Sequence, residues 1–305
     1  GVSSTPVAGQ ATATTGQIGS APRTPWGDPD LRGTWTNATT TPMERPADLA
    51  GKEFLTEEER AVRNPGSGIS VENPSVIMPT GAYNDFWLET GELSLRTSLI
   101  VDPPDGKYPP LTPEALRGQR EQRGSFANGG FDSVEDFSTY DRCLTRGMPG
   151  AMSPGFYNHN YQILQTPDHV AILVEMIHDA RIVPLDGRSH VSPAVGQWLG
   201  DSRGRWEGDT LVVDVAGFNG LAWLDRAGNF ASDTLRVVER YTPLGPNALL
   251  YEATLEDENV FTRPWKMSMP LYRRLEENVQ VLEFKCVEFS EELLYGHLRK
   301  KKVDD

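Results

Sequence analysis

The feature that most constrains this fold is a series of short apolar segments, separated by turn signals, between about residue 160 and residue 290. Alternation is clearest at 235–240, where Leu235 and Val237 fall on one face of an extended chain and Arg236 and Arg240 on the other. Turns such as TPDH and LGPN separate neighbouring segments. We predict strands over 161–165, 170–183, 210–214, 234–241, 248–255 and 279–288. The expected fold is mainly β, an antiparallel meander that closes into a lipocalin-like barrel or a sandwich.

The first half of the chain predicts long irregular, Pro-rich segments with a few short helices. Thr56 stands three residues before Glu59, the capping-box spacing, and predicts a helix that ends near Arg63. Thr112 followed by Pro113 predicts a second helix that ends near residue 123. Residues 93–102 read as one strand.

These patterns divide the chain into four regions. We expect an extended low-complexity arm over 1–23, an irregular Pro- and Trp-rich region over 24–158, an antiparallel β-domain over 159–289 and a C-terminal helix or basic tail over 290–305. The arm carries one charged residue, Arg23, and resembles the segment that follows a removed signal peptide. We therefore expect a periplasmic or extracellular location. The sequence contains no run of about 18 apolar residues, so we predict no transmembrane segment.

The net charge restricts the partners. The chain has 43 acidic and 29 basic residues, a formal net charge of −14. Nucleic-acid binding needs a basic surface that neutralises phosphates, so no nucleic-acid partner is expected. The same charge opposes adsorption of the whole body onto an anionic membrane.

Several stretches resemble a family of exported bacterial proteins of unassigned function. They are PWGDPDLRGTW at 25–35, RTSLIVDPPDG at 96–106, RIVPLDGRSH at 181–190 and GDSRGRWEGDTLVVD at 200–214. The resemblance runs from Trp26 to about Trp265 and implies no mechanism. Gly33-Thr34-Trp35 also resembles the GxW start of lipocalin-like barrels, which implies a fold only.

One group of residues suggests catalysis. The segment 174–183 would place His178 among apolar residues on one strand face and Arg181 on the other. Asp186, Arg188 and His190 follow within a short turn, so a general base, an orienting carboxylate and an anion-holding guanidinium occur close together in sequence. The alternative is a tight Asp-Gly turn with a structural ion pair and a hydrogen-bonded core histidine.

The chain offers no metal or cofactor signature. Four of its five histidines, at positions 159, 169, 178 and 190, have spacings that match no metal-ligand pair. Phosphate-binding and dinucleotide-binding glycine patterns are absent, so we expect neither metal nor cofactor. Cys143 and Cys286 are the two cysteines of the sequence. Three alternatives stay open: a disulfide between them, two buried free thiols, or a reactive thiol at one of them.

Two further groups suggest binding. Tyr161, Trp198 and Trp206 are candidates to line a pocket for a small apolar ligand, or they fill the barrel core. The basic run at the end of the chain, Arg299, Lys300, Lys301 and Lys302, contacts a partner or is a solvated terminus.

Three functions remain open. The first is a non-catalytic extrinsic subunit that docks on other protein subunits of a larger periplasmic or membrane-bound complex, for example a respiratory or photosynthetic one, through its extended arm. The second is a cofactor-independent lyase, isomerase or hydrolase that acts on a small apolar or aromatic molecule through a histidine base. The third is a lipocalin-like carrier.

Overall fold

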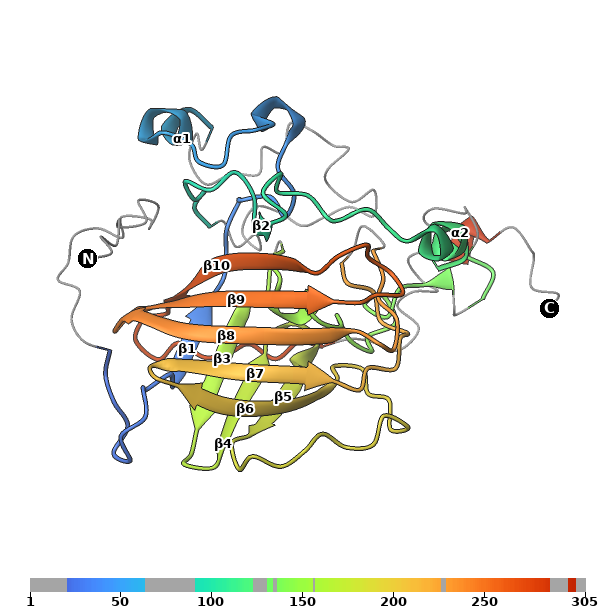
Figure 1. The fold of residues 1–305 in the computed structure, drawn as a ribbon. Coiled ribbons are helices and arrows are strands. Elements are labelled where there is room, and N and C mark those ends of the chain that lie inside the picture. The colour runs from blue at the N-terminus through green and yellow to red at the C-terminus, as the bar shows by residue number, and fades with distance from the viewer. Residues whose placement is uncertain are drawn as a thin grey trace, which may run out of the picture.

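A computed structural model describes residues 21–63, 91–122, 131–133, 136–155, 157–225, 229–285 and 296–299 (Figure 1). Its centre is one antiparallel sheet of ten strands in the order β5-β4-β3-β1-β10-β9-β8-β7-β6, and β2 also pairs with β10. The strands are β1 Gly33–Thr36, β2 Ile100–Asp102, β3 Asn160–Gln165, β4 His169–Val174, β5 Ala180–Pro184, β6 Asp201–Glu207, β7 Thr210–Ala216, β8 Arg236–Gly245, β9 Ala248–Glu256 and β10 Trp265–Arg273.

The sheet curls into a nearly closed barrel. In Figure 1, β6 to β10 form the near wall, and β1, β3, β4 and β5 form the far wall. The two ends of the strand order, β5 and β6, meet through side chains rather than through a hydrogen-bonded ladder. A Cβ on Gly204 of β6 would lie 2.7 Å from Cγ1 of Val183 on β5, so a glycine permits this approach. The predicted mainly β, lipocalin-like barrel is confirmed.

The barrel interior is filled by large side chains. In β4 and β9 every second residue points inward and is buried, and in β7 the outward Thr210 and Val212 are buried as well. The largest fully buried side chains include Trp35, Tyr161, Tyr241, Tyr251 and Trp265. The predicted 2-residue alternation therefore follows directly from one packed face.

Both predicted α-helices are present, as α1 Glu57–Arg63 and α2 Pro113–Gln122. The Thr56 hydroxyl accepts a hydrogen bond from the Glu59 N–H at 3.2 Å, and the Glu59 carboxylate accepts one from the Thr56 N–H at 2.8 Å. This is the reciprocal capping box that the spacing predicts. Thr112 caps α2 by accepting from the Ala115 N–H at 3.1 Å.

The predicted strand over 170–183 is wrong as a single element. β4 ends at Val174, a 3₁₀ turn spans Met176–His178, and β5 begins at Ala180. Ile177 and His178 have φ angles of 62° and 50°, in the left-handed region that a strand cannot contain. Ile177 is nevertheless buried, so packing of its side chain overrides the extended preference of a β-branched residue.

Other strand boundaries also differ from prediction. Only Ile100–Asp102 of the predicted 93–102 segment is a strand. Residues 279–285 form no strand, and 286–288 lie outside the described residues. β6 and β10 were not predicted. β10 contains Pro270, a residue that argues against a strand because it has no N–H to donate.

The sheet draws strands from both halves of the sequence. β1 lies between β3 and β10, so residues from the irregular 24–158 region complete the barrel. The structure describes residues 21–23 of the predicted arm, while residues 1–20 and most of the C-terminal tail lie outside the described residues. Among the described helices, none is long and apolar enough to cross a membrane.

Candidate functional site

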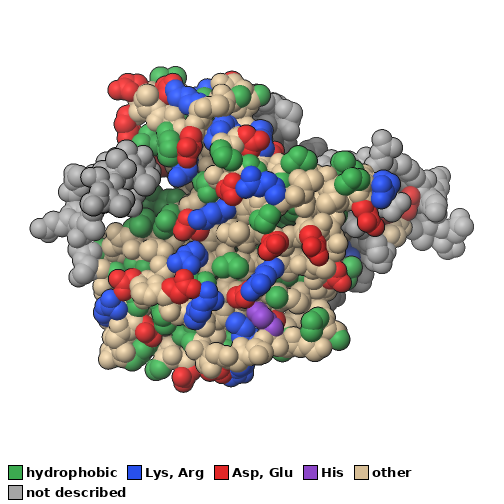
Figure 2. Space-filling model, viewed as in Figure 1, with side chains coloured by type: hydrophobic (Ala, Val, Ile, Leu, Met, Phe, Trp, Pro, Cys, Tyr) green, Lys and Arg blue, Asp and Glu red, His purple; other side chains and the backbone are tan. Residues whose placement is uncertain are grey.

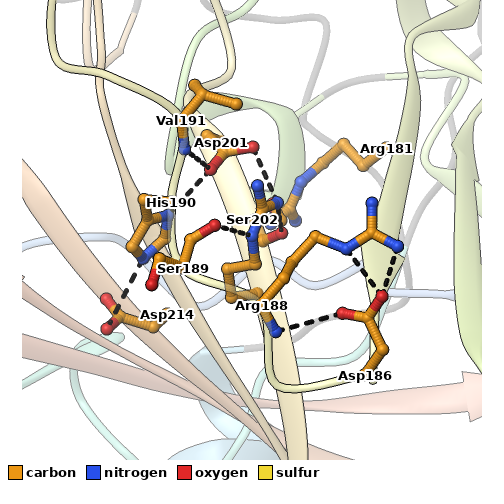
Figure 3. A network of polar contacts seen from close by, with 10 residues as sticks. Arg181, Asp186, Arg188, Ser189, His190, Val191, Asp201, Ser202 and Asp214 are labelled. Atoms are coloured by element: carbon orange, nitrogen blue, oxygen red, sulfur yellow. Dashed lines mark hydrogen bonds and ion pairs between the residues drawn. The ribbon is translucent and has the colours of Figure 1, made fainter.

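Asp186 and Arg188 form a self-contained pair in the turn after β5. The Arg188 Nε donates to Asp186 Oδ2 at 2.6 Å, and the Arg188 backbone N–H donates to Oδ1 at 3.1 Å (Figure 3). These hydrogen bonds lower the pKa of Asp186 to about 2. Both residues lie in an exposed turn, where the carboxylate and the guanidinium engage each other.

His190 lies against two carboxylates of the near wall. Its Nδ1 is 2.9 Å from Asp201 Oδ2, and its Nε2 is 3.7 Å from Asp214 Oδ2 (Figure 3). Asp201 also accepts from Arg203 at 2.7 Å, and hydrogen bonds from Arg236 hold the pKa of Asp214 below its usual value. Each carboxylate thus already has an arginine partner, and His190 joins a charge network on the outer surface.

Arg181 occupies a different environment, inside the barrel. Its Nη1 donates to Glu239 Oε1 at 3.0 Å, and the two side chains are 2% and 0% exposed. Burial alone would lower the pKa of Arg181, but the Glu239 carboxylate raises it above the usual value. Tyr241 and Tyr251 donate to the same carboxylate at 3.0 and 2.9 Å. Arg181 Nη2 also donates to the Ser202 hydroxyl at 3.3 Å, and among the described residues the buried Arg181 Nε has no hydrogen-bond partner.

His178 lies at the end of the barrel, in the 3₁₀ turn after β4. Its side chain is exposed, and its Nδ1 is 3.1 Å from the carbonyl oxygen of Phe284. The expected apolar strand face around His178 does not form, because the strand ends at Val174. The five predicted catalytic residues therefore occupy four environments: the Asp186–Arg188 turn, the His190 network, the Arg181 interior pair and the His178 turn.

The predicted aromatic pocket residues also separate. Tyr161 is fully buried and its hydroxyl accepts from Asn37 Nδ2 at 2.7 Å. Trp206 is partly buried against the core, and Trp198 is partly exposed in the segment before β6. None of the three lines the cavity of about 300 Å³ that the structure contains.

The remaining predicted residues lie partly outside the described chain. Cys143 takes part in a disulfide, and Cys286, the other cysteine of the sequence, lies outside the described residues. The Arg299 Nε donates to the Phe131 carbonyl at 3.1 Å, whereas Lys300, Lys301 and Lys302 lie outside the described residues. Within the described ranges, no cluster of three or more His, Cys, Asp or Glu residues is placed to hold a metal ion.

The near wall carries an ion-paired face, formed by the outward residues of β6 to β10. Figure 2 shows acidic and basic side chains interleaved over these strands. Opposite charges within one strand, on neighbouring strands or one strand apart meet at hydrogen-bonding distance, as on an ordinary solvated sheet surface. The pairs are Arg205–Glu207, Arg240–Glu207, Arg236–Asp214, Arg203–Asp201 and Lys266–Glu252.

The far wall carries an uncharged face, formed by the outward residues of β3, β4 and β5. These strands have no outward Asp, Glu, Lys or Arg. Leu164, Ala171 and Ile182 lie side by side across the three strands in one register row. Leu164 is 53% exposed and Ile182 is 57% exposed, so the row faces solvent.

The segment after β10 passes the start of β3 and the end of β4, and Arg274 Nη1 donates to Asn160 Oδ1 of β3 at 2.6 Å. The backbone N–H of Leu282 donates to Glu175 Oε1 at 2.7 Å, directly after the end of β4. Leu282 and Leu275 are more than half exposed. Sequence reasoning missed this face, because alternation shows which residues point outward but not which strands become neighbours.

Comparison with known proteins adds no relative: no protein-family model, no curated protein and no solved structure matches this chain.

Proposed function

We propose that this chain is a non-catalytic, exported β-domain that acts as an extrinsic subunit of a larger periplasmic or membrane-bound complex. The uncharged face is the docking surface in this proposal. The occupant is another protein subunit that presents an apolar surface of its own. Export rests on the composition of residues 1–23.

The observation that carries the proposal is the aligned row Leu164, Ala171 and Ile182. In a chain with a net charge of −14, three adjacent strands without an outward charge are a marked local departure. Depletion of charge and exposed aliphatic side chains are typical of the centre of a protein–protein interface. The ion-paired face of the same barrel supplies the contrast expected of a solvated surface.

The chemistry of the candidate residues supports the same choice. Four of the five predicted catalytic residues engage carboxylates or guanidinium groups of this chain, and the fifth, His178, contacts a backbone carbonyl. Such contacts fit structural roles. Docking requires no catalytic constellation.

The test is association after a charge is added to the uncharged face. Ile182→Glu places a carboxylate on an exposed β-branched position of β5. Thr254→Glu is the matched control, because Thr254 is an exposed β-branched residue at the ion-paired face. The wild-type protein, isolated from its source under mild conditions, should have a native mass far above 33.7 kDa.

We expect Ile182→Glu to release the chain from that assembly and Thr254→Glu to leave it bound. Thermal unfolding of both variants should stay close to that of the wild type, since exposed substitutions usually change stability by about 0.5 kcal/mol or less. A wild-type monomer or homodimer after mild isolation would contradict the proposal. Equal retention of both variants in the assembly would contradict the assigned surface.

A further inference from the structure

A cavity of about 300 Å³ lies at one end of the barrel, away from both outer faces. Its wall comes from the segments that follow β1, precede β3, follow β4 and follow β7. Antiparallel pairing from β7 through β8, β9, β10 and β1 to β3 and β4 brings these four strand ends to the same end of the barrel. The volume is about twice the ~150 Å³ of a cavity that holds benzene, so a two-ring molecule fits.

Close packing at two glycines holds the segment 145–155, which lines part of the cavity, against its neighbours. A Cβ on Gly155 would lie 2.4 Å from Nε2 of His159, and one on Gly147 would lie 2.8 Å from the carbonyl oxygen of Trp223. Both glycines therefore allow chain segments to approach more closely than other residues would. A pocket built this way needs little rearrangement to bind.

The cavity combines aromatic walls with a cation. The Arg146 guanidinium lies 5.9 Å from the centre of the Tyr140 ring, and the Tyr140 and Tyr157 hydroxyls are 3.3 Å apart. Trp223 adds a third aromatic side chain to the wall. Arg146 Nη1 already donates to the Ser153 carbonyl at 3.3 Å, and a guanidinium that stacks through its face can donate further hydrogen bonds through its edge to a carboxylate.

Two further ionisable groups refine the ligand class. Burial, and then the charge of Arg146, holds the pKa of His159 well below its usual value, so this imidazole is neutral at neutral pH and can hydrogen-bond without adding charge. Asp225 also lines the cavity, and it accepts from Tyr108 at 2.9 Å and from Asn229 Nδ2 at 2.6 Å. Its negative charge disfavours a second anionic group on the ligand.

We propose that this cavity binds a small aromatic monocarboxylic acid, with the carboxylate on Arg146 and the rings among Tyr140, Tyr157 and Trp223. The site is independent of the proposed docking surface. The claim concerns binding, and it keeps the small aromatic ligand that the sequence suggested while moving it to different residues.

The test is calorimetric titration of the purified wild-type chain with 1-naphthoate, 1-naphthamide and a naphthalene dicarboxylate. We expect 1-naphthoate to bind at least tenfold more tightly than the neutral amide and than the dicarboxylate. Equal affinity for acid and amide, or no binding of the acid, would overturn the proposal. This comparison uses wild-type protein and does not depend on a variant that folds.

Arg146→Gln locates the site. It should weaken 1-naphthoate binding at least tenfold and leave amide binding nearly unchanged, whereas Arg205→Gln on the ion-paired face should change neither. Undiminished binding of the acid by Arg146→Gln would place the ligand elsewhere and overturn the assignment. These titrations contain no partner protein, so a negative result would not affect the docking proposal. Likewise, a negative result in the association experiment would not affect the proposed ligand site.

Discussion

The two walls of the barrel share one interior and differ in what they show to solvent. On the ion-paired face, Arg236 and Asp214 or Lys266 and Glu252 join neighbouring strands. On the uncharged face, Leu164, Ala171 and Ile182 occupy equivalent outward positions with no charge among them. The interior alternation is the same on both walls, so the folding requirement does not explain the difference. Docking on one side only, the proposed function, would account for it.

The largest expected loss of stability comes from a substitution inside the barrel. It tests whether the interior, rather than either outer face, stabilises both walls. Glu239→Gln leaves the buried Arg181 guanidinium without its carboxylate, which should cost about 3–5 kcal/mol of unfolding free energy. Urea denaturation measures it. Glu252→Gln, the outer-face control, should cost about 1 kcal/mol or less. Similar costs for the two substitutions would mean that the outer pairs also hold the fold.

The next effect tests the centre of the uncharged face against its periphery. Ala171→Arg places a cation in the middle of the register row and should weaken association with the assembly at least tenfold, about 1.4 kcal/mol. Gln162→Arg, at an outward position on β3 next to β1, should weaken it less. Co-isolation of each variant over a dilution series measures both. A larger loss for Gln162→Arg would move the docking surface toward β1.

A pH titration separates the barrel end from the ion-paired face. The folded state holds the pKa of His159 well below 6.5, so the unfolded chain binds the proton first and stability falls as pH decreases below 6.5, by at most about 1.4 kcal/mol per pH unit. Unfolding of wild type and His159→Gln at pH 7.5, 6 and 5 measures it. The variant should lose this slope, and a wild-type slope retained in full would contradict the assignment.

The carboxylates of the ion-paired face respond in a lower pH range. Arginine side chains hold the pKa values of Asp214 and Glu207 below 3.8 and 4.5, the ordinary values. Their contribution to stability is present above those values and is lost as pH falls through the lower folded pKa. The His159 effect therefore appears first on acidification.

The smallest effect comes from a single pair on the ion-paired face. Asp214→Asn removes the charge that Arg236 and His190 share, and the expected cost is about 0.2–1 kcal/mol. High salt should shrink the difference, because it screens exposed charges. Unfolding in low salt and in 1 M NaCl provides the measurement. A cost above about 2 kcal/mol, unchanged by salt, would show that this face has a structural role.

Local sequence signals predicted much of the fold. Alternation at 235–240 and the capping box at Thr56 and Glu59 act within a few residues, and both were confirmed. β1 was harder to predict, because four residues, Gly33–Thr36, gain their strand partners only from distant β3 and β10. The break at Ile177 was missed, because burial of one side chain set the backbone against its preference.

Proximity in sequence gave a poor account of the site. Arg181 and Asp186 are five residues apart, yet one side chain points into the barrel and the other lies in an exposed turn. The cavity residues Arg146, Tyr157 and Asp225 come from irregular segments that show no periodicity. Only the assembled barrel end brings them together.

The most direct test of the central claim is site-specific crosslinking from the two faces. A photoreactive amino acid is placed at position 182 on the uncharged face or at position 254 on the ion-paired face, and the protein is illuminated in its native assembly. The account predicts a covalent product with one defined protein subunit from position 182 and none from position 254. The same product from both positions, or none from position 182 in an intact assembly, would contradict it.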